Sequence, residues 1–508
     1  MSDQMERRVG TGGPPVSSPV RSPGLGIEAN GINVIGESER KGTPRQLFWP
    51  WCAANVSVLA VSYGAFVLSF GLDLAQALVA AVLGAVLSFL LVGLVSIAGK
   101  RGSAPTLVLS RAAFGRFGNL VPGAVSYLLL VGWETVLVSL STIATATVFG
   151  RLGWGDGNLT KVIAFLVVAA VIVVAGILGF DAIMRLQKWL TVALIAVTVV
   201  YILLTLDHVD LGAATALKAG SLSALVGGTI LVMTGFGVGW VNSAADYSRY
   251  LPRASSTRGV VGWPTLGGSL PVVILVAYGV LLCASDGKLS QAVAGDPIGA
   301  LTTILPTWFL LPFALVAIAG LVSGAVLDIY SSGLTLLTLG LRTPRWVAAA
   351  IDGVLMVLGT IYIVWVADSF LGVFMAFLII LGVPMSAWCG IFLADLALRR
   401  RDYDEHKLFD HTRAGYGSVN VASVALMAVA TLVGWGLVID TTGAGKGLSW
   451  LGFLLGPLGF GGRTGAWAFA NLGVPVALAI GFVGYLLIGV RSVRRQEKGT
   501  VPEPALTH

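Results

Sequence analysis

Two acidic residues lie inside apolar stretches of the sequence, where a carboxyl group has chemical consequences. Glu134 follows Gly132 and Trp133, and Asp328 lies in the run from Ser323 to Gly333. An acid near the centre of a bilayer costs about 2.5–3.5 kcal/mol on insertion scales, so it usually faces a cavity or a partner. We therefore expect Asp328 and Glu134 to bind a ligand or couple to a cation. The alternative is a neutral carboxylic acid that ties helices together.

A glycine-rich interruption provides a second candidate. The sequence is almost entirely apolar from Leu222 and then places three glycines in five residues before Trp240. Each Gly weakens a helix by about 1 kcal/mol relative to Ala, and broken backbone at membrane depth is tolerated only where it is buried in protein or lines a cavity. We expect Phe236, Gly239 and Trp240 to line a binding site. The alternative is close helix packing through glycine.

The first apolar stretch carries a similar interruption. Asn55, Ser57, Ser62 and Gly64 follow Pro50 within an otherwise apolar run. Interrupted helices in corresponding positions of two halves are typical of transporters whose site lies near the bilayer midplane. The pattern favours a site that includes Asn55 and Ser57. Interhelical hydrogen bonds, worth about 0.6 kcal/mol in membranes, are the alternative.

Composition identifies a polytopic membrane protein. Of the 508 residues, 56% are hydrophobic and 11% are charged, against about 25% charged in average soluble domains. The net charge of +7 lies in loops between apolar runs, which indicates membrane topology rather than a nucleic-acid partner. The cysteines and histidines are scattered, at Cys52, Cys283, Cys389, His208, His406, His411 and His508. We expect no catalytic residues, no metal and no cofactor apart from a coupling ion, H⁺ or Na⁺.

Twelve apolar spans of membrane length follow a polar start. They cover about 48–70, 73–97, 119–149, 161–181, 187–206, 222–245, 262–283, 304–340, 346–366, 369–397, 418–438 and 469–490. With the N-terminus in the cytoplasm, 26 of the 32 basic residues lie on the inner side, as the positive-inside rule requires. We expect a multi-pass protein of the cell membrane with both termini cytoplasmic. Its parts are a disordered tail (1–43), a transmembrane domain (44–495) and a C-terminal tail (496–508).

Several motifs together resemble a known family. They are PRQLFWPWCAANVSVLAVSYGA (44–65), GWET (132–135), GFGVGWVNSAADYSRYLP (235–252), LDIYSSGL (327–334) and VPMSAWCGIFLADLALRRRDYD (383–404). From about Gly36 to Arg495 the chain is similar to the purine–cytosine permease branch of nucleobase–cation symporter family 1.

This resemblance implies an all-α fold of twelve transmembrane helices. Ten form a five-plus-five inverted repeat, as in the leucine-transporter fold, and two are peripheral. It also implies a secondary transporter rather than an enzyme, which imports cytosine or purines by alternating access with H⁺ or Na⁺. The expected partners are the nucleobase and the lipid bilayer.

The resemblance also implies site residues. In the family the base stacks between aromatic rings of the third and sixth helices, which indicates Trp133 and either Trp240, which we prefer, or Phe236. Polar groups of the eighth helix bind the ring edge, and Asp328 stands where relatives commonly have Asn. Gly324 or Ser323 replaces a further polar position about one turn earlier. A sodium ion in relatives lies between the first and eighth helices, near the positions of Asn55, Ser57 and Ser323 here.

Three alternatives stay open. The substrate could be another ring, such as allantoin, hydantoin, uracil or thiamine, and cationic thiamine would suit the acid at Asp328. A passive channel or uniporter, or an integral-membrane enzyme, is a further alternative. We favour a proton or substrate role for Asp328, because Asp can titrate whereas Asn cannot.

Overall fold

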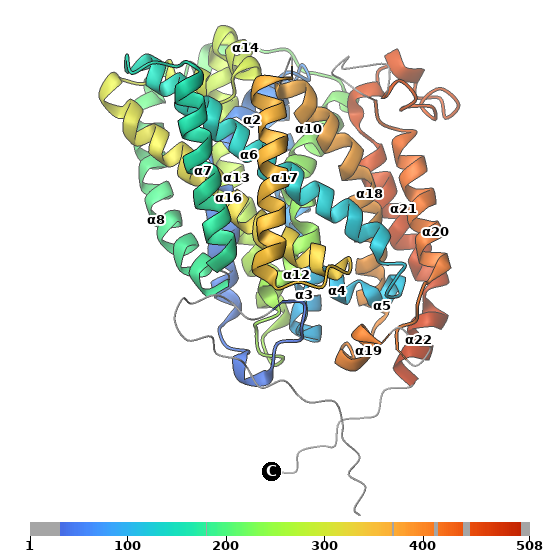
Figure 1. Ribbon diagram of the computed structural model, residues 1–508. Helices are drawn as coiled ribbons and strands as arrows, with labels where there is room; N and C mark the ends of the chain where they lie inside the picture. The colour runs from blue at the N-terminus through green and yellow to red at the C-terminus, as the bar shows by residue number, and fades with distance from the viewer. Residues whose placement is uncertain (1–30, 179, 368–369, 411–414, 440–447, 499–508) are drawn as a thin grey trace, which may run out of the picture.

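The computed structural model describes residues 31–178, 180–367, 370–410, 415–439 and 448–498. Within these ranges the chain forms helices and no β-strand. The long helices stand side by side in one upright bundle (Figure 1). The all-α architecture expected from the sequence is confirmed.

The long helices reproduce the predicted spans. Nine helices of the described chain are long and apolar enough to cross a membrane, and two bent pairs and one shorter apolar helix bring the total to the predicted twelve. They are α1 (Phe48–Asn55) with α2 (Val58–Leu68), α3 (Leu74–Gly102), α6 (Leu120–Arg151), α7 (Asn158–Leu178), α8 (Phe180–Thr205), α10 (Leu222–Gly235) with α11 (Gly237–Trp240) and α12 (Ala244–Ser248), α13 (Thr257–Ser285), α16 (Thr307–Thr338), α17 (Arg345–Trp365), α18 (Phe370–Leu398), α20 (Val421–Trp435) and α21 (Gly473–Ile488) with α22 (Val490–Lys498).

Short helices connect these spans. They are η1 (Glu37–Glu39), η2 (Pro44–Leu47), α4 (Thr106–Leu109), α5 (Arg111–Phe114), η3 (Leu206–His208), α9 (Leu211–Thr215), η4 (Val241–Ser243), α14 (Gly287–Gly295), α15 (Gly299–Thr302), α19 (Glu405–Phe409), η6 (Gly462–Thr464) and η7 (Ala468–Ala470). Residues 1–30 and 499–508 of the predicted tails lie outside the described residues. Residues 31–43 contact the bundle, and Arg40 among them is buried.

Both predicted interruptions are real breaks. Helices α1 and α2 meet at 65°, with Val56 outside helical geometry and the Ser57 hydroxyl accepting the Leu59 N–H at 3.3 Å. Helix α10 ends at Phe236, whose φ of −126° and ψ of −102° stop the helix. A Cβ on Gly237 would lie 2.4 Å from the Ser88 backbone, so only glycine lets α11 approach α3 this closely.

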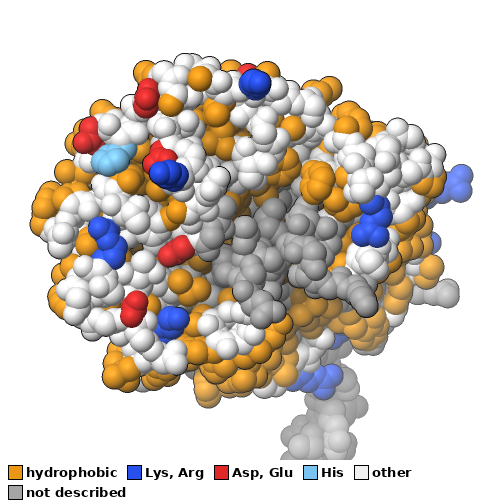
Figure 2. Space-filling model, turned by 90° about the horizontal axis from the view of Figure 1, so that it is seen from above, with side chains coloured by type: hydrophobic (Ala, Val, Ile, Leu, Met, Phe, Trp, Pro, Cys, Tyr) orange, Lys and Arg blue, Asp and Glu red, His pale blue; other side chains and the backbone are white. Residues whose placement is uncertain are grey.

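The outer surface and the two ends of the bundle differ in character. Helices α7 and α8 present large apolar side chains outward, which fits contact with lipid. We call the end that holds the start of α1 and the ends of α3, α12 and α18 the basic end. It carries Arg40, Arg45, Lys100, Arg101, Arg249, Arg253, Arg258, Arg399, Arg400 and Arg401. At the opposite end, which carries α14, charged side chains are few and scattered (Figure 2).

A buried ion pair fixes the basic end of α18. Arg399 donates from Nε to Asp395 Oδ2 at 2.6 Å and from an η nitrogen to Oδ1 at 2.9 Å. The Tyr485 hydroxyl of α21 donates to the same carboxylate at 2.9 Å. Because both charged side chains are almost fully buried, losing one leaves the other unpaired in a medium of low dielectric constant.

Asp395→Asn should therefore destabilise the fold by about 3 kcal/mol, the lower part of the range for breaking a buried pair. The measurement is thermal unfolding of the detergent-solubilised protein. Asp207→Asn, at a carboxylate that is 79% exposed, is the matched control and should leave the Tm unchanged. Equal Tm values for the two variants would show that the pair contributes nothing.

Candidate functional site

The facing surfaces of α6 and α16 form the centre of the site. Trp133 and Leu137 are one turn apart on α6, as Gly324 and Asp328 are on α16. Residues four apart lie on the same face of a helix. A Cβ on Gly324 would lie 3.0 Å from Leu137 Cδ1, so the α6 face with Trp133 and Leu137 packs against the α16 face with Gly324 and Asp328.

Trp133 lies against the second helix break. A Cβ on Gly239 of α11 would be 2.9 Å from the Trp133 indole nitrogen, so glycine is what lets the break approach the ring. The indole N–H is buried and has no hydrogen-bond partner. Phe374 and Phe377 of α18 meet the indole edge to face, with ring centroids at 5.5 Å and 5.9 Å. Trp133 thus presents an unused donor inside an aromatic environment.

The two candidate stacking partners occupy different surroundings. Trp240 is partly buried and packs edge to face on Trp51 of α1, with centroids 5.6 Å apart. Phe236 lies 4.6 Å from the Tyr63 ring of α2. Trp240 follows directly on Gly239, which touches Trp133, whereas Phe236 sits at the end of α10 next to α2. Trp240 stays the predicted stacking partner, with Phe236 as the alternative.

Asp328 is a carboxyl group without a donor. The residue is 1% exposed, and neither side-chain oxygen has a hydrogen-bond partner among the described residues. An unsatisfied buried polar group costs about 1–3 kcal/mol, and more if it is charged. An ordered water, an ion or a ligand can complete the hydrogen bonds of such a group. Asp328 thus offers an unused acceptor on the face opposite Trp133.

The first helix break lies against the same stretch of α16. A Cβ on Gly320 would be 2.8 Å from the Val56 carbonyl oxygen, and one on Gly324 would be 3.9 Å from the Ala54 carbonyl oxygen. Ser323 lies between these glycines and is fully buried. Oxygen ligands of this kind suit a hard cation.

Two of the residues named for this region have their own local bonds. Asn55 donates from its side-chain amide to the Trp51 carbonyl at 2.7 Å, which ties it to its own helix. Ser57 caps α2 with its hydroxyl. Both nevertheless flank Ala54 and Val56, whose carbonyl groups lie near Gly324 and Gly320 of α16.

Glu134 points away from Trp133 into a different cluster. Its Oε1 lies 2.7 Å from the Ser332 hydroxyl of α16, and that hydroxyl also lies 2.7 Å from Oδ2 of Asp352 on α17. Glu134 and Asp352 are both fully buried. The structure therefore does not bring Glu134 together with Asn55, Ser57 and Ser323.

Glu134 and Asp328 are not the only acids inside helices, contrary to the sequence analysis. Asp246, Asp352 and Asp395 are also buried within helices. Asp352 and Asp395 fall inside the predicted spans 346–366 and 369–397, so the signal was present. Asp246 accepts from the Thr106 N–H and hydroxyl, both at 2.8 Å, which no local pattern could indicate.

A cavity of about 530 Å³ lies away from this site, at the basic end of α16. Four arginines contribute to its lining, Arg111, Arg116, Arg342 and Arg345. Across the described chain, no three His, Cys, Asp or Glu side chains are placed to hold a metal ion. The site between α6, α11 and α16 instead combines an aromatic ring, a free N–H and a free carboxyl group. These groups can bind a flat polar ring without performing covalent chemistry on it.

Solved structures share this fold. Mhp1, a nucleobase-cation-symport-1 family transporter in a closed conformation with bromovinylhydantoin bound, aligns with a TM-score of 0.66 at 19% identity over 92% of this chain and 96% of that one. Its inward-facing conformation gives 0.64 at 21% identity over 94% and 100%. A Na⁺-coupled sialic acid symporter gives 0.58 at 12% identity over 89% and 91%. These likenesses confirm the leucine-transporter-like architecture.

Sequence comparisons agree. A Bacillus subtilis (strain 168) protein named as a purine-cytosine permease, YxlA, is 24% identical over 467 residues, 89% of this chain and 95% of that one. Purine-cytosine permease FCY2 of Saccharomyces cerevisiae is 23% identical over 264 residues, 50% of this chain and 48% of the yeast protein. Residues 34–456 match the family described as permeases for cytosine/purines, uracil, thiamine and allantoin. Because that match covers most of the sequence, the chain belongs to this permease family.

Proposed function

We propose that this permease imports cytosine or a purine together with a cation, by alternating access. One observation carries the proposal. The Trp133 N–H and both Asp328 oxygens are buried without partners, on helix faces that look at each other. A nucleobase edge carries amino and ring N–H donors beside carbonyl and ring-nitrogen acceptors, so it supplies both missing partners. Stacking of a base on an aromatic side chain adds about 1–3 kcal/mol.

Coupling to a cation supplies the driving force. A neutral base gains nothing from the membrane potential, whereas a cation gains about 2.3 kcal/mol per 100 mV. The oxygen groups between the α1–α2 break and α16 are one place where such a cation could be held. A ligand shifts a protein between states only by its different affinity for them, so cation and base must both favour the state that forms the site.

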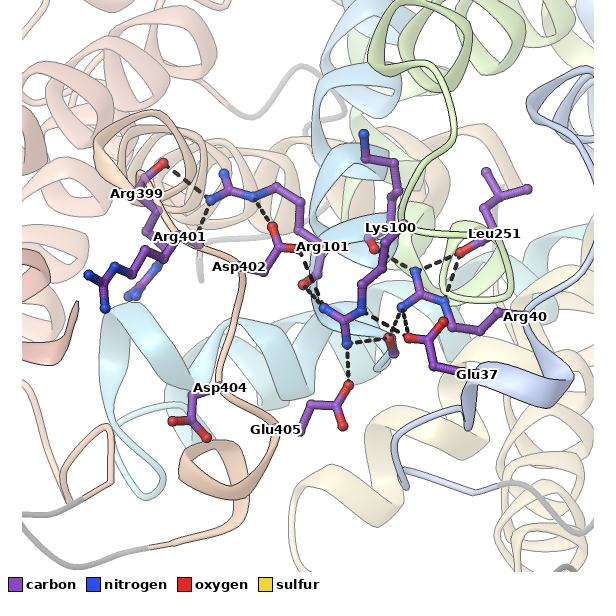
Figure 3. A network of polar contacts seen from close by, with 12 residues as sticks. Glu37, Arg40, Lys100, Arg101, Leu251, Arg399, Arg401, Asp402, Asp404 and Glu405 are labelled. Carbon is purple, nitrogen blue, oxygen red and sulfur yellow. Dashed lines mark hydrogen bonds and ion pairs between the residues drawn. The ribbon is translucent and has the colours of Figure 1, made fainter. Parts of the chain in front are cut away.

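A network of charged groups joins several segments at the basic end (Figure 3). Arg253, which follows α12, contacts Glu37 at 3.0 Å, Asp402 at 3.4 Å and also Glu405. Arg101 at the end of α3 contacts Asp402 at 3.1 Å. These contacts join the segments that precede α1 and follow α3, α12 and α18. By the positive-inside rule this end is cytoplasmic, so the network would hold the cytoplasmic gate shut.

Protonation of Glu37 does not open this network near neutral pH. Partial burial raises the pKa of the Glu37 carboxyl, but the hydrogen bond from Arg253 and the charges of Arg40 and Arg253 outweigh it, so the pKa is lowered overall. A carboxyl with a lowered pKa loses its contribution only as the pH falls through that lowered value. A pH dependence of transport near neutral pH would therefore not come from the Glu37 carboxyl.

A cationic ring such as thiamine is the second candidate. Asp328 is an acid, and no basic side chain of the described residues bonds to its oxygens. A positively charged ring would pair with the carboxylate. The neutral alternatives, allantoin, hydantoin and uracil, gain no such advantage.

Uptake of labelled cytosine into proteoliposomes tests the proposal. The assay uses Na⁺ or no Na⁺ at two pH values, with unlabelled adenine, hypoxanthine, uracil, allantoin and thiamine as competitors. Saturable uptake that cytosine or purines block is the expected result. Competition by thiamine alone would favour the second candidate, and uptake that needs no ion gradient would indicate a uniporter.

Two substitutions test the site itself. Trp133→Ala removes the stacking surface and Asp328→Asn weakens a charge-assisted hydrogen bond, so each should raise KM for cytosine about tenfold. Asp328→Asn should keep the pH dependence of uptake if Asp328 binds substrate. Trp189→Ala, at an indole that is 70% exposed, and Asp207→Asn are the controls. Unchanged KM values in both site variants would place the substrate elsewhere.

Arg253→Gln should open the cytoplasmic gate more often. Exposed ion pairs contribute about 0.2–1 kcal/mol each, so losing three should shift the equilibrium roughly tenfold. The readout is alkylation of buried Cys52 of α1, which packs against Leu194 of α8, in a background without Cys283 and Cys389. Arg258→Gln, at an exposed arginine of the same end, is the control, and equal labelling rates would contradict this role of the network.

A further inference from the structure

Two hydrogen bonds link Glu134, Ser332 and Asp352 across three helices, with Ser332 in the middle. Glu134 comes from α6, Ser332 from α16 and Asp352 from α17, and all three are fully buried. The Ser332 hydroxyl oxygen lies 2.7 Å from a carboxyl oxygen on each side. The other oxygens, Oε2 of Glu134 and Oδ1 of Asp352, have no partner. The nucleobase site described above leaves this cluster unexplained.

The hydrogens of these two hydrogen bonds do not balance if both acids are ionised. A serine hydroxyl has one hydrogen, so it can donate to one carboxyl group only. The second contact at hydrogen-bond distance needs a hydrogen of its own, and only the other carboxyl group can carry it. One of the two acids is then a carboxylic acid that donates to the Ser332 oxygen, while the Ser332 hydroxyl donates to the remaining carboxylate.

The charges around the pair favour the same conclusion. Asp328 acts on Glu134 as a third acid; it lies one turn before Ser332 on the same face of α16, is 1% exposed and has no partner. The Tyr127 hydroxyl of α6 also faces Asp352, but it is a neutral donor and supplies no positive charge. Three ionised carboxyl groups without a neighbouring base would be very costly at membrane depth.

The basic groups on the surrounding helices are engaged elsewhere. Arg345 of α17 donates to the Gly176 and Ile177 carbonyls, and Arg151 of α6 donates to the Thr302 carbonyl. Lys161 lies in the first turn of α7, and Arg399 of α18 is paired with Asp395. Tyr330 of α16 bonds to Arg249, and Tyr362 of α17 faces outward. No cation within the described chain therefore neutralises the pair.

We propose that Glu134, Ser332 and Asp352 bind the proton that the permease co-transports. This inference rests on the proposed symport function and names the site and the ion. On binding, a proton from water on one side of the membrane converts one carboxylate to a carboxylic acid. On release, the proton returns to water on the other side, so no further reactant is needed.

The location links this proton to the substrate. Glu134 follows Trp133 on α6, and Ser332 lies one turn after Asp328 on α16. Helices α6 and α16 therefore carry both the proposed base site and two of the three groups that share the proton. The third group, Asp352, lies on α17. Loss of the proton would break one of the two bonds at Ser332 and place two like charges together. A site that changes the packing of α6 and α16 in this way is coupled to the base site, and the coupling is reciprocal.

Infrared difference spectroscopy of the full chain in liposomes tests proton binding without any substrate. A protonated carboxyl group is seen through its C=O stretch. Glu134→Gln and Asp352→Asn should each remove one such signal at neutral pH, because the new amide donates to Ser332 and leaves the other acid ionised. Asp328→Asn identifies the contribution of Asp328, and Asp207→Asn is the control. A signal of wild-type intensity in both pair variants would overturn the proposal.

Transport then tests coupling. Glu134→Gln and Asp352→Asn should keep KM for cytosine but lose the pH dependence of uptake and the proton movement that cytosine drives. If these residues had a structural role alone, the variants would lower the protein yield or raise KM, but the pH profile of uptake would keep its shape. Wild-type pH dependence in both variants would overturn the proposal while leaving the permease function intact. Failure of the wild-type protein to transport any tested ring would instead overturn the permease proposal, and the infrared result would still decide proton binding.

Discussion

Backbone hydrogen bonding at membrane depth is the constraint on which this structure depends. Each interruption, at Val56 and at Phe236, removes helical bonds where water cannot replace them, and unsatisfied groups there cost several kcal/mol each. The fold meets this cost by bringing another helix against each break. Glycines on α16 let the first break approach that helix closely. At the second break, Gly237 lets α11 approach Ser88 of α3, and the Gly237 N–H donates to the Ser88 hydroxyl at 3.3 Å. Among the buried side-chain groups left without partners in the described chain are the Trp133 N–H and both Asp328 oxygens.

The buried carboxyl groups differ in their hydrogen-bond and ion-pair partners, and these partners indicate different roles. Asp395 is paired with Arg399, and Asp246 accepts two hydrogen bonds from Thr106. Both have complete local partners and serve packing. Asp328 has no hydrogen-bond donor among the described residues, which fits a group that binds a ligand. Glu134 shares one hydroxyl with a second acid, which fits a group that holds a proton.

Much of the fold could be predicted from the sequence, because span length, charge asymmetry and glycine clusters are local signals. The break at Gly235 to Gly239 was predicted this way, whereas Asp328 was named as an acid within an apolar run and Trp133 from the family resemblance. The pairing of Glu134 with Asp352 could not be found, because it joins residues far apart in sequence through Ser332. Asp352 itself was missed although it falls inside a predicted span, where the signal that marked Glu134 and Asp328 was also present.

An experimental structure with cytosine bound would test the central claim most directly. The proposal predicts density for the ring against Trp133, beside Gly239, with its polar edge within hydrogen-bond distance of Asp328. Cytosine bound instead in the arginine-lined cavity at the basic end of α16, with Trp133 and Asp328 unchanged, would contradict this assignment.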